Sequence, residues 1–198
     1  MFSDIEGSTA MNERLGDKRW MDLLREHNAI VREHVKAHGG FEVKSEGDGF
    51  MLAFQSARRA LECAIDTQHA FAERNASLPA HPEALEGRAE PAPPAHGSTG
   101  SPRAGQEVRA STEGDVEPIR LRIGLRNGEA IKEGDDFFGK HVNLAARVAG
   151  QATGGEILVS SLLKDLTESG GDIAFGDGWE VELKGLSSPQ RVFAVAWQ

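Results

Sequence analysis

Two aspartates stand where short extended segments are expected to end. Asp4 lies between an extended start and a Gly-Ser-Thr turn, and Asp48 lies at the tip of an expected hairpin. Carboxylates from neighbouring strand ends can hold a pair of hard cations such as Mg²⁺, which prefer oxygen ligands and keep positions open for substrate phosphates. Turn chemistry also explains both residues, because Asp4 can cap its turn and Asp-Gly pairs are common at hairpin tips. On local sequence alone, turn chemistry is the favoured explanation.

Four further polar residues are candidates for a ligand site. Asn143 and Arg147 are four residues apart, so on a helix they project from the same face. Taken alone, they are explained as an N-cap asparagine and a surface arginine. Lys44 and Asp136, taken alone, are explained as a solvated strand lysine and a loop acid. None of the four predicts a function by itself.

The first half of the chain predicts one strand, two helices and a hairpin. After the extended residues 1–4, apolar residues recur at three- and four-residue steps through 20–35, which indicates an amphipathic helix. Residues 41–54 form two apolar runs around an acidic glycine turn, which is typical of a β-hairpin. Ser56 is a suitable N-cap for a second amphipathic helix.

The second half predicts further strands and short helices. Residues 119–125 alternate strictly between apolar and other residues, which indicates a strand with one buried face. Residues 129–132 are expected to return as a partner strand after the Asn127-Gly128 turn. The remaining expected elements are a helix at 142–148, a strand at 156–160, a helix at 161–167 and an antiparallel pair at 179–183 and 191–197. This order predicts an α+β fold with a ferredoxin-like βαββαβ core, an antiparallel-rich sheet and helices on one face.

Residues 77–118 differ in composition from the rest of the chain. They hold seven of the eight prolines, mixed with Ala, Gly, Ser and Glu, and no aromatic residue. Such a segment buries too little apolar surface to offset the entropy of ordering it, so we expect a mobile insertion. Residues 1–198 are therefore predicted to form one domain that this insertion interrupts.

The overall composition excludes several classes of protein. With 22 basic and 31 acidic residues the formal net charge is −9, which argues against a nucleic-acid binder. No apolar run approaches the roughly 20 residues of a membrane span, and no signal peptide is evident. The single cysteine, Cys63, cannot form an intrachain disulfide, so a reducing cytoplasmic location is expected.

Ordered motifs over most of the chain outside the insertion resemble the class III nucleotidyl cyclase catalytic domain. The motifs are Phe2-Ser-Asp-Ile-Glu-Gly-Ser-Thr9, Glu42-Val-Lys-Ser-Glu-Gly-Asp-Gly-Phe50, Asp136-Phe-Phe-Gly-Lys-His-Val-Asn-Leu-Ala-Ala-Arg147, Gly155-Glu-Ile-Leu-Val-Ser160 and Leu183-Lys-Gly-Leu186. Several motifs in the same order, with matching internal spacing, are far more specific than any one of them.

The resemblance implies a metal site and a purine site. It places two divalent cations, Mg²⁺ or Mn²⁺, on the carboxylates of Asp4 and Asp48, with the backbone carbonyl of Ile5 as a further ligand. It places the purine-binding residues at Lys44 and Asp136. A lysine and an aspartate suit adenine, whose N1 accepts and whose N6 amino group donates a hydrogen bond. Guanylyl cyclases of the family usually carry Glu and a small residue there.

Three more residues acquire roles through the resemblance. In the family, the residue at Asn143 positions the ribose, and the arginine at Arg147 neutralises charge that develops on the α-phosphate. Such electrostatic catalysis contributes about 10²–10³ in rate or more. Lys184 resembles the lysine that binds the terminal phosphates, although its motif is short.

The implied activity is that of an adenylate cyclase. The ribose 3′-oxygen of ATP attacks the α-phosphorus and gives cyclic AMP and pyrophosphate. The implied assembly is a head-to-tail homodimer, in which each site takes its metals from one chain and its purine and transition-state groups from the other.

Two alternatives remain open from the sequence. The chain could be a degenerate cyclase-homology module that binds nucleotide or a partner without turnover. A palm-like nuclease or polymerase fragment would share the two aspartates but would not explain Lys44 or Asp136. One departure favours the degenerate module: only three residues precede Asp4, so we expect a shortened central strand that holds this carboxylate less firmly.

Overall fold

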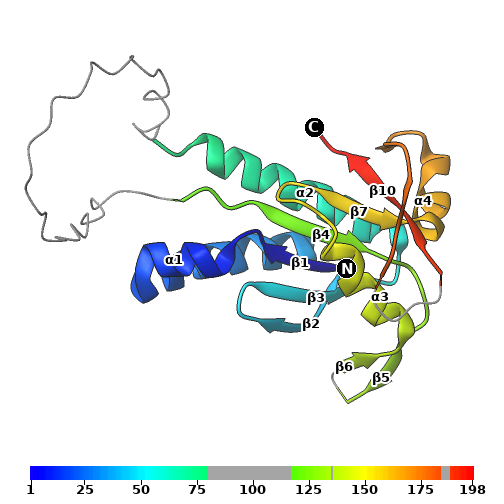
Figure 1. Cartoon of the computed structure of the whole chain (residues 1–198), viewed down its shortest axis with the longest axis horizontal. Helices are drawn as coiled ribbons and strands as arrows, with labels where there is room; N and C mark the ends of the chain where they lie inside the picture. The colour runs from blue at the N-terminus through cyan, green and yellow to red at the C-terminus, as the bar shows by residue number, and fades with distance from the viewer. Residues whose placement is uncertain (80–116, 135, 184–187) are drawn as a thin grey trace, which may run out of the picture.

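The computed structural model describes residues 1–79, 117–134, 136–183 and 188–198. Its main sheet has the strand order β2-β3-β1-β4-β7-β10-β8, and β9 also pairs with β10 (Figure 1). The strands of this sheet are β1 (Phe2–Ile5), β2 (Phe41–Glu46), β3 (Gly49–Ala53), β4 (Leu121–Leu125), β7 (Ile157–Ser160), β8 (Ala174–Phe175), β9 (Trp179–Val181) and β10 (Gln190–Ala196). All pairings are antiparallel except that of β4 with β7. The predicted α+β class with an antiparallel-rich sheet is confirmed.

Three helices cover one face of the sheet. They are α1 (Ser8–Ala37), α2 (Ala57–Ala76) and α4 (Ser161–Thr167). Their buried residues Val31, Leu61 and Leu163 pack in one core with Ile123 of β4. Removal of this apolar surface from water is the main stabilising contribution to the fold. In the described part of the chain, no helix is both long and apolar enough to cross a membrane.

The expectation that all helices lie on one face is wrong for α3 (Lys140–Ala149). Leu144 and Val148 of α3 pack against Leu158 of β7, in a second core separate from the one beneath α1 and α2. β7 is buried at all four positions, so both of its faces need a cover. Gly124 allows α3 to approach, because a Cβ atom there would lie 2.2 Å from the backbone nitrogen of Ala149.

The central strand β1 is short, as expected, yet both of its edges are paired. Phe2 lies opposite Met51 of β3 on one side and Gly124 of β4 on the other, and the pairing with β4 continues to Ile5 opposite Leu121. Strands on both sides therefore fix the register of Asp4 within the sheet.

The expected return strand at 129–132 pairs differently from our prediction. β5 (Ile131–Glu133) pairs with β6 (Asp136–Phe138) in a separate two-stranded hairpin, which Figure 1 shows below the main sheet near α3. It does not pair with β4, because β1 and β7 already occupy both edges of that strand.

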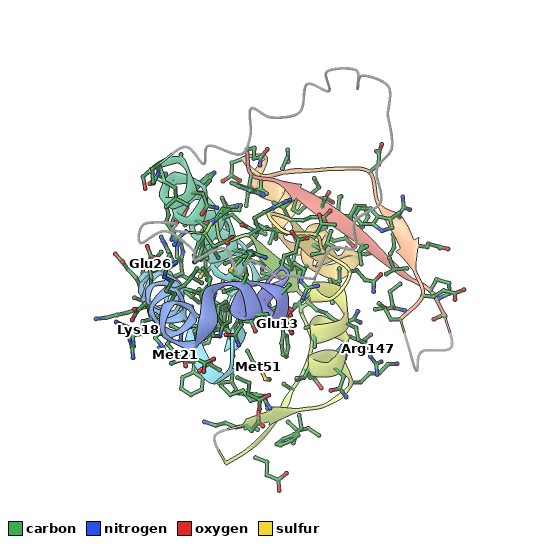
Figure 2. All side chains as sticks on the ribbon, turned by 60° about the vertical axis from the view of Figure 1, so that its left-hand side comes forward. Glu13, Lys18, Met21, Glu26, Met51 and Arg147 are labelled. Atoms are coloured by element: carbon green, nitrogen blue, oxygen red, sulfur yellow. The ribbon has the colours of Figure 1, made fainter. Side chains whose placement is uncertain are left out.

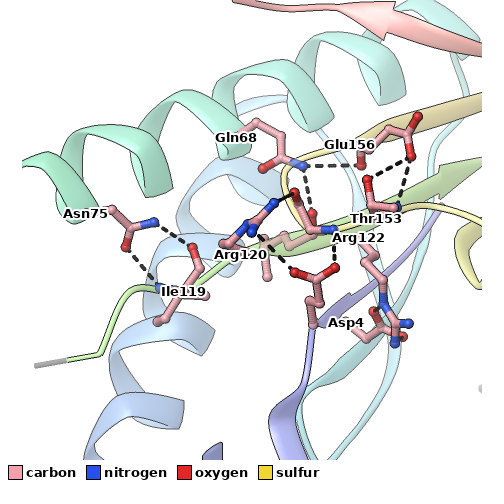
Figure 3. A network of polar contacts seen from close by, with 11 residues as sticks. Asp4, Gln68, Asn75, Ile119, Arg120, Arg122, Thr153 and Glu156 are labelled. Atoms are coloured by element: carbon pink, nitrogen blue, oxygen red, sulfur yellow. Dashed lines mark hydrogen bonds and ion pairs between the residues drawn. The ribbon is translucent and has the colours of Figure 1, made fainter. Parts of the chain in front are cut away.

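The ends of the expected insertion meet at one asparagine. The side chain of Asn75, in the last turn of α2, donates to the carbonyl oxygen of Ile119 at 2.7 Å and accepts from its amide at 3.0 Å (Figure 3). Residues 80–116, the greater part of the predicted insertion, lie outside the described residues.

Candidate active site

The two aspartates of the predicted metal site lie on neighbouring elements. Asp4 is in β1, and Asp48 is in the turn between β2 and β3, the strand that pairs with β1. The Oδ2 atom of Asp48 accepts a hydrogen bond from the backbone amide of Ile5 at 2.9 Å. The structure thus brings Asp4, Ile5 and Asp48 together, while their role as metal ligands stays a prediction.

Arg122 of β4 is a charged residue of this site that our sequence interpretation missed. Its Nε and Nη2 atoms donate to the two carboxylate oxygens of Asp4, at 2.7 and 2.9 Å (Figure 3). The pair lies directly across the β1–β4 register, and each side chain is about one-third exposed. The hydrogen bond to Asp4 raises the pKa of Arg122 above its usual value. The alternation of 119–125 placed Arg122 opposite the predicted buried face of its strand but could not name its partner.

The same face of the chain carries a second arginine just before β4, which forms an ion pair with the acid two residues beyond Asp4. Arg120 lies 3.7 Å from Glu6 and donates to the carbonyl oxygen of Gly154 at 2.8 Å, while Glu6 accepts from the Gly154 amide at 2.7 Å. Arg120 and Arg122 therefore serve different carboxylates, although they are only two residues apart.

The predicted purine-binding residues meet across 92 positions of sequence. The Lys44 ammonium group on β2 lies 3.3 Å from Oδ2 of Asp136 at the start of β6. The other oxygen of Asp136 accepts from the amide of Phe137 at 2.7 Å, which orients the carboxylate. The two residues are therefore neighbours in the fold, unlike an unrelated strand lysine and loop acid.

A hollow of about 230 Å³ lies between the strands and α3. Asp4 and Lys44 line it from β1 and β2, with Met51 of β3 and Ala146 of α3. One depression thus contains a predicted metal ligand and a predicted purine-binding residue.

The predicted ribose and transition-state residues lie on the exposed side of α3. Asn143 is exposed and Arg147 is half-buried, whereas Leu144 and Val148 face the sheet. Figure 2 shows Arg147 projecting outward from the helix. Within the described ranges, neither Asn143 nor Arg147 forms a hydrogen bond or ion pair with the predicted residues on β1, β2 or β6. The predicted phosphate-binding residue Lys184 lies outside the described residues.

The oxygen donors on β1 and the β2–β3 turn suit a divalent cation in their chemistry. The described residues contain no cluster of three or more acidic, histidine or cysteine side chains that could hold a metal. A cation here would therefore have two carboxylates and the Ile5 carbonyl as protein donors. That small set leaves positions for substrate oxygens, as Mg²⁺ sites at phosphates usually do.

Solved structures of the same architecture are nucleotidyl cyclases. The crystal structure of the guanylyl cyclase Cya2 matches with a TM-score of 0.72 and 22% identity, over 98% of this chain and 89% of that chain. The adenylyl cyclase CyaB from P. aeruginosa matches with a TM-score of 0.68 and 23% identity, over 98% and 91%. The fold is therefore that of a class III cyclase catalytic domain.

Sequence comparison then gives the family. The chain belongs to the family described as the adenylate and guanylate cyclase catalytic domain, whose sequence model matches residues 1–196. An adenylate cyclase from Mycosarcoma maydis is 30% identical over 173 residues, which is 84% of this chain and 6% of that protein. A receptor-type adenylate cyclase from Trypanosoma congolense is 30% identical over 182 residues, 81% of this chain and 22% of that protein. The chain spans less than a quarter of the length of these two relatives.

Proposed function

We propose that this domain is an adenylate cyclase, which converts ATP to 3′,5′-cyclic AMP and pyrophosphate. The observation that carries the proposal is the contact of 3.3 Å between Lys44 and Asp136. With ATP bound, Lys44 would donate to adenine N1 and Asp136 would accept from the N6 amino group. When ATP binds, Lys44 and Asp136 give up their ion pair with each other and hydrogen-bond the purine instead. The site therefore favours a base with this donor and acceptor pattern.

The remaining groups act on the ribose and the triphosphate. Asn143 orients the ribose, so that its 3′-oxygen faces the α-phosphorus, and Arg147 stabilises the negative charge that grows on the α-phosphate. Lys184 binds the terminal phosphates. Two Mg²⁺ or Mn²⁺ ions on Asp4, Asp48 and Ile5 would supply charge neutralisation and a lowered pKa of the 3′-hydroxyl group.

We propose that the active sites are shared across a homodimer. Asn143 and Arg147 form no hydrogen bond or ion pair with Asp4 or Asp48 among the described residues, which is consistent with their serving the site of a second chain. A two-fold dimer would supply the missing groups twice, with Asp4 and Asp48 of one chain facing the purine and transition-state residues of the other. A single-chain site is the rival arrangement, because Asp4 and Lys44 line the same hollow.

The test is turnover of ATP and of GTP with Mn²⁺ or Mg²⁺, with the cyclic products separated by chromatography. We expect cyclic AMP from ATP and at least about tenfold less product from GTP, because a site built for one hydrogen-bonding pattern leaves polar groups unpaired with the other. The double variant Lys44→Glu with Asp136→Gly should lose most ATP turnover. Equal use of both purines by the unmodified chain would disprove the adenine preference.

The second candidate function is a nucleotide-binding module without turnover. The observation in its favour is that both oxygens of Asp4 are already engaged by Arg122. Nucleotide binding measured by calorimetry, together with no cyclic product under any of the metal conditions, would support this candidate over the enzyme.

A further inference from the structure

The carboxylate of Asp4 already has a cationic partner in this chain. Arg122 approaches both oxygens in the two-pronged geometry that makes arginine–carboxylate pairs strong. The cross-strand register fixes the two residues opposite each other, so the contact does not depend on a loose surface rotamer. Each side chain is about one-third exposed, which leaves the pair accessible to a competing ion.

Arg122 also neutralises the surrounding acids. Asp48 and Glu6 both lie close enough to stabilise its positive charge, in addition to Asp4. Glu6 has a second arginine, Arg120, whereas Asp48 has only the Ile5 amide among the described hydrogen bonds. Without Arg122, Asp4 and Asp48 would repel each other at the place where a cation is expected.

We propose that Arg122 is an internal counter-ion that competes with the divalent cation for Asp4. This inference rests on the proposed use of Asp4 and Asp48 as cation ligands. A cation that binds an oxygen of Asp4 must displace at least one of the two hydrogen bonds from the Arg122 guanidinium group. The cation and Arg122 are both positively charged, so they repel each other when they lie beside the same carboxylate. Arg122 is therefore a positioning residue, which holds the carboxylates in place without metal and weakens cation binding in the absence of substrate.

The test measures Mn²⁺ binding to the full chain without nucleotide, from the electron paramagnetic resonance signal of free Mn²⁺. The variant Arg122→Gln should bind Mn²⁺ at least about fivefold more tightly than the unmodified chain, because a competing charge has been removed. Asp4→Asn should lose most of the binding. The matched control is Arg120→Gln, which removes a charge from the same strand surface but not from Asp4, and should change the affinity by less than about twofold.

Equal or weaker Mn²⁺ binding by Arg122→Gln would overturn the inference, as would an equal gain in Arg120→Gln. Because Arg122→Gln could disturb the fold, a second measurement uses the unmodified chain. In a nuclear magnetic resonance titration with Mg²⁺, the Nε–H signal of Arg122 should shift while that of Arg120 stays in place. An unchanged Arg122 signal at saturating Mg²⁺ would overturn the inference. Neither measurement involves turnover, so absence of cyclic product would count against the proposed enzyme and leave this result standing.

Discussion

The two faces of strand β4 differ in what covers them. Leu121, Ile123 and Leu125 point into the core beneath α1, α2 and α4 and are at most 1% exposed. Arg122, between them, points to the other face, pairs with Asp4 and is 31% exposed. The first face, which we call the covered face, holds the strands in register. On the second, which we call the open face, α3 packs beside Gly124 but leaves Arg122 and the charged groups that the register aligns partly exposed. Changes on the covered face should therefore alter stability, and changes on the open face should alter chemistry.

The strongest test of this division is Asp48→Asn on the open face. The amide oxygen can still accept from Ile5, so the turn should keep its shape, but the negative charge is lost. We expect turnover to fall by at least about 100-fold, because the proposed cation site would lose a charged ligand. The free energy of unfolding should change by less than about 1 kcal/mol.

The matched control is Glu46→Gln, which removes an exposed acid from the same hairpin. Glu46 lines the same hollow as Asp4 but is not a predicted ligand, so turnover should stay within about threefold of the unmodified chain. Comparable losses in the two variants would mean that the total charge of the hairpin matters and not the ligand at Asp48.

The next test asks whether a second chain supplies the residues that complete the proposed active site. Chains with Asp48→Asn and chains with Arg147→Ala should each be nearly inactive alone. After mixing, each heterodimer should hold one site that lacks both groups and one unmodified site, so about a quarter of the original activity should return. The activity should fall on dilution as the dimers dissociate. No recovery, in samples where subunit exchange is measured independently, would favour a single-chain site.

On the covered face, Leu61→Ala should act on stability alone. Leu61 of α2 is fully buried in the core, so its truncation should lower the free energy of unfolding by about 2–5 kcal/mol. Urea denaturation measures this loss, and turnover per folded molecule at low temperature should stay within about twofold. A large loss of turnover in fully folded protein would show that the two faces are coupled.

A smaller effect is expected from His27, a polar residue within the covered face. It is fully buried beside Phe50 and Phe71, and its Nε2 atom has no hydrogen-bond partner within the described part of the chain. Burial lowers the pKa of His27, although its contact with Asn28 opposes the shift. The unfolded chain therefore binds a proton more readily, and stability should fall as the pH drops below about 6.5.

The His27→Met variant isolates this contribution. Its free energy of unfolding should decrease less between pH 8 and pH 5.5 than that of the unmodified chain, because methionine has no group that takes up a proton when the chain unfolds. Identical pH dependence in the two proteins would mean that His27 binds a proton as readily in the folded state as in the unfolded state.

The covered face could be predicted from the sequence because apolar periodicity reports burial directly. Strict alternation at 119–125 correctly placed Ile123 inside and Arg122 outside. The same pattern does not say which strand lies alongside, so the expected partner at 129–132 was wrong. The alternation also does not show whether helices cover one face of the sheet or both. For that reason the prediction that all helices lie on one face is wrong for α3.

The open face could be predicted only in part, because polar partners depend on register between distant segments. The resemblance to cyclases brought Lys44 and Asp136 into one site, and the structure places them in contact. The pairing of Asp4 with Arg122 follows from the alignment of β1 with β4 across more than a hundred residues, which no local pattern encodes.

Because of the two hydrogen bonds between Asn75 and Ile119, the position of β4 does not depend on the number of residues between α2 and β4. The last turn of α2 is hydrogen-bonded to Ile119, just before β4, so β4 enters the sheet at a fixed point whatever the length of the segment between them. The entropy of closing a loop grows only slowly with its length, so sequence can be added or removed here at little thermodynamic cost. This position is therefore expected to tolerate insertions during evolution, and a sensor or reporter domain could be grafted there without redesign of the main sheet.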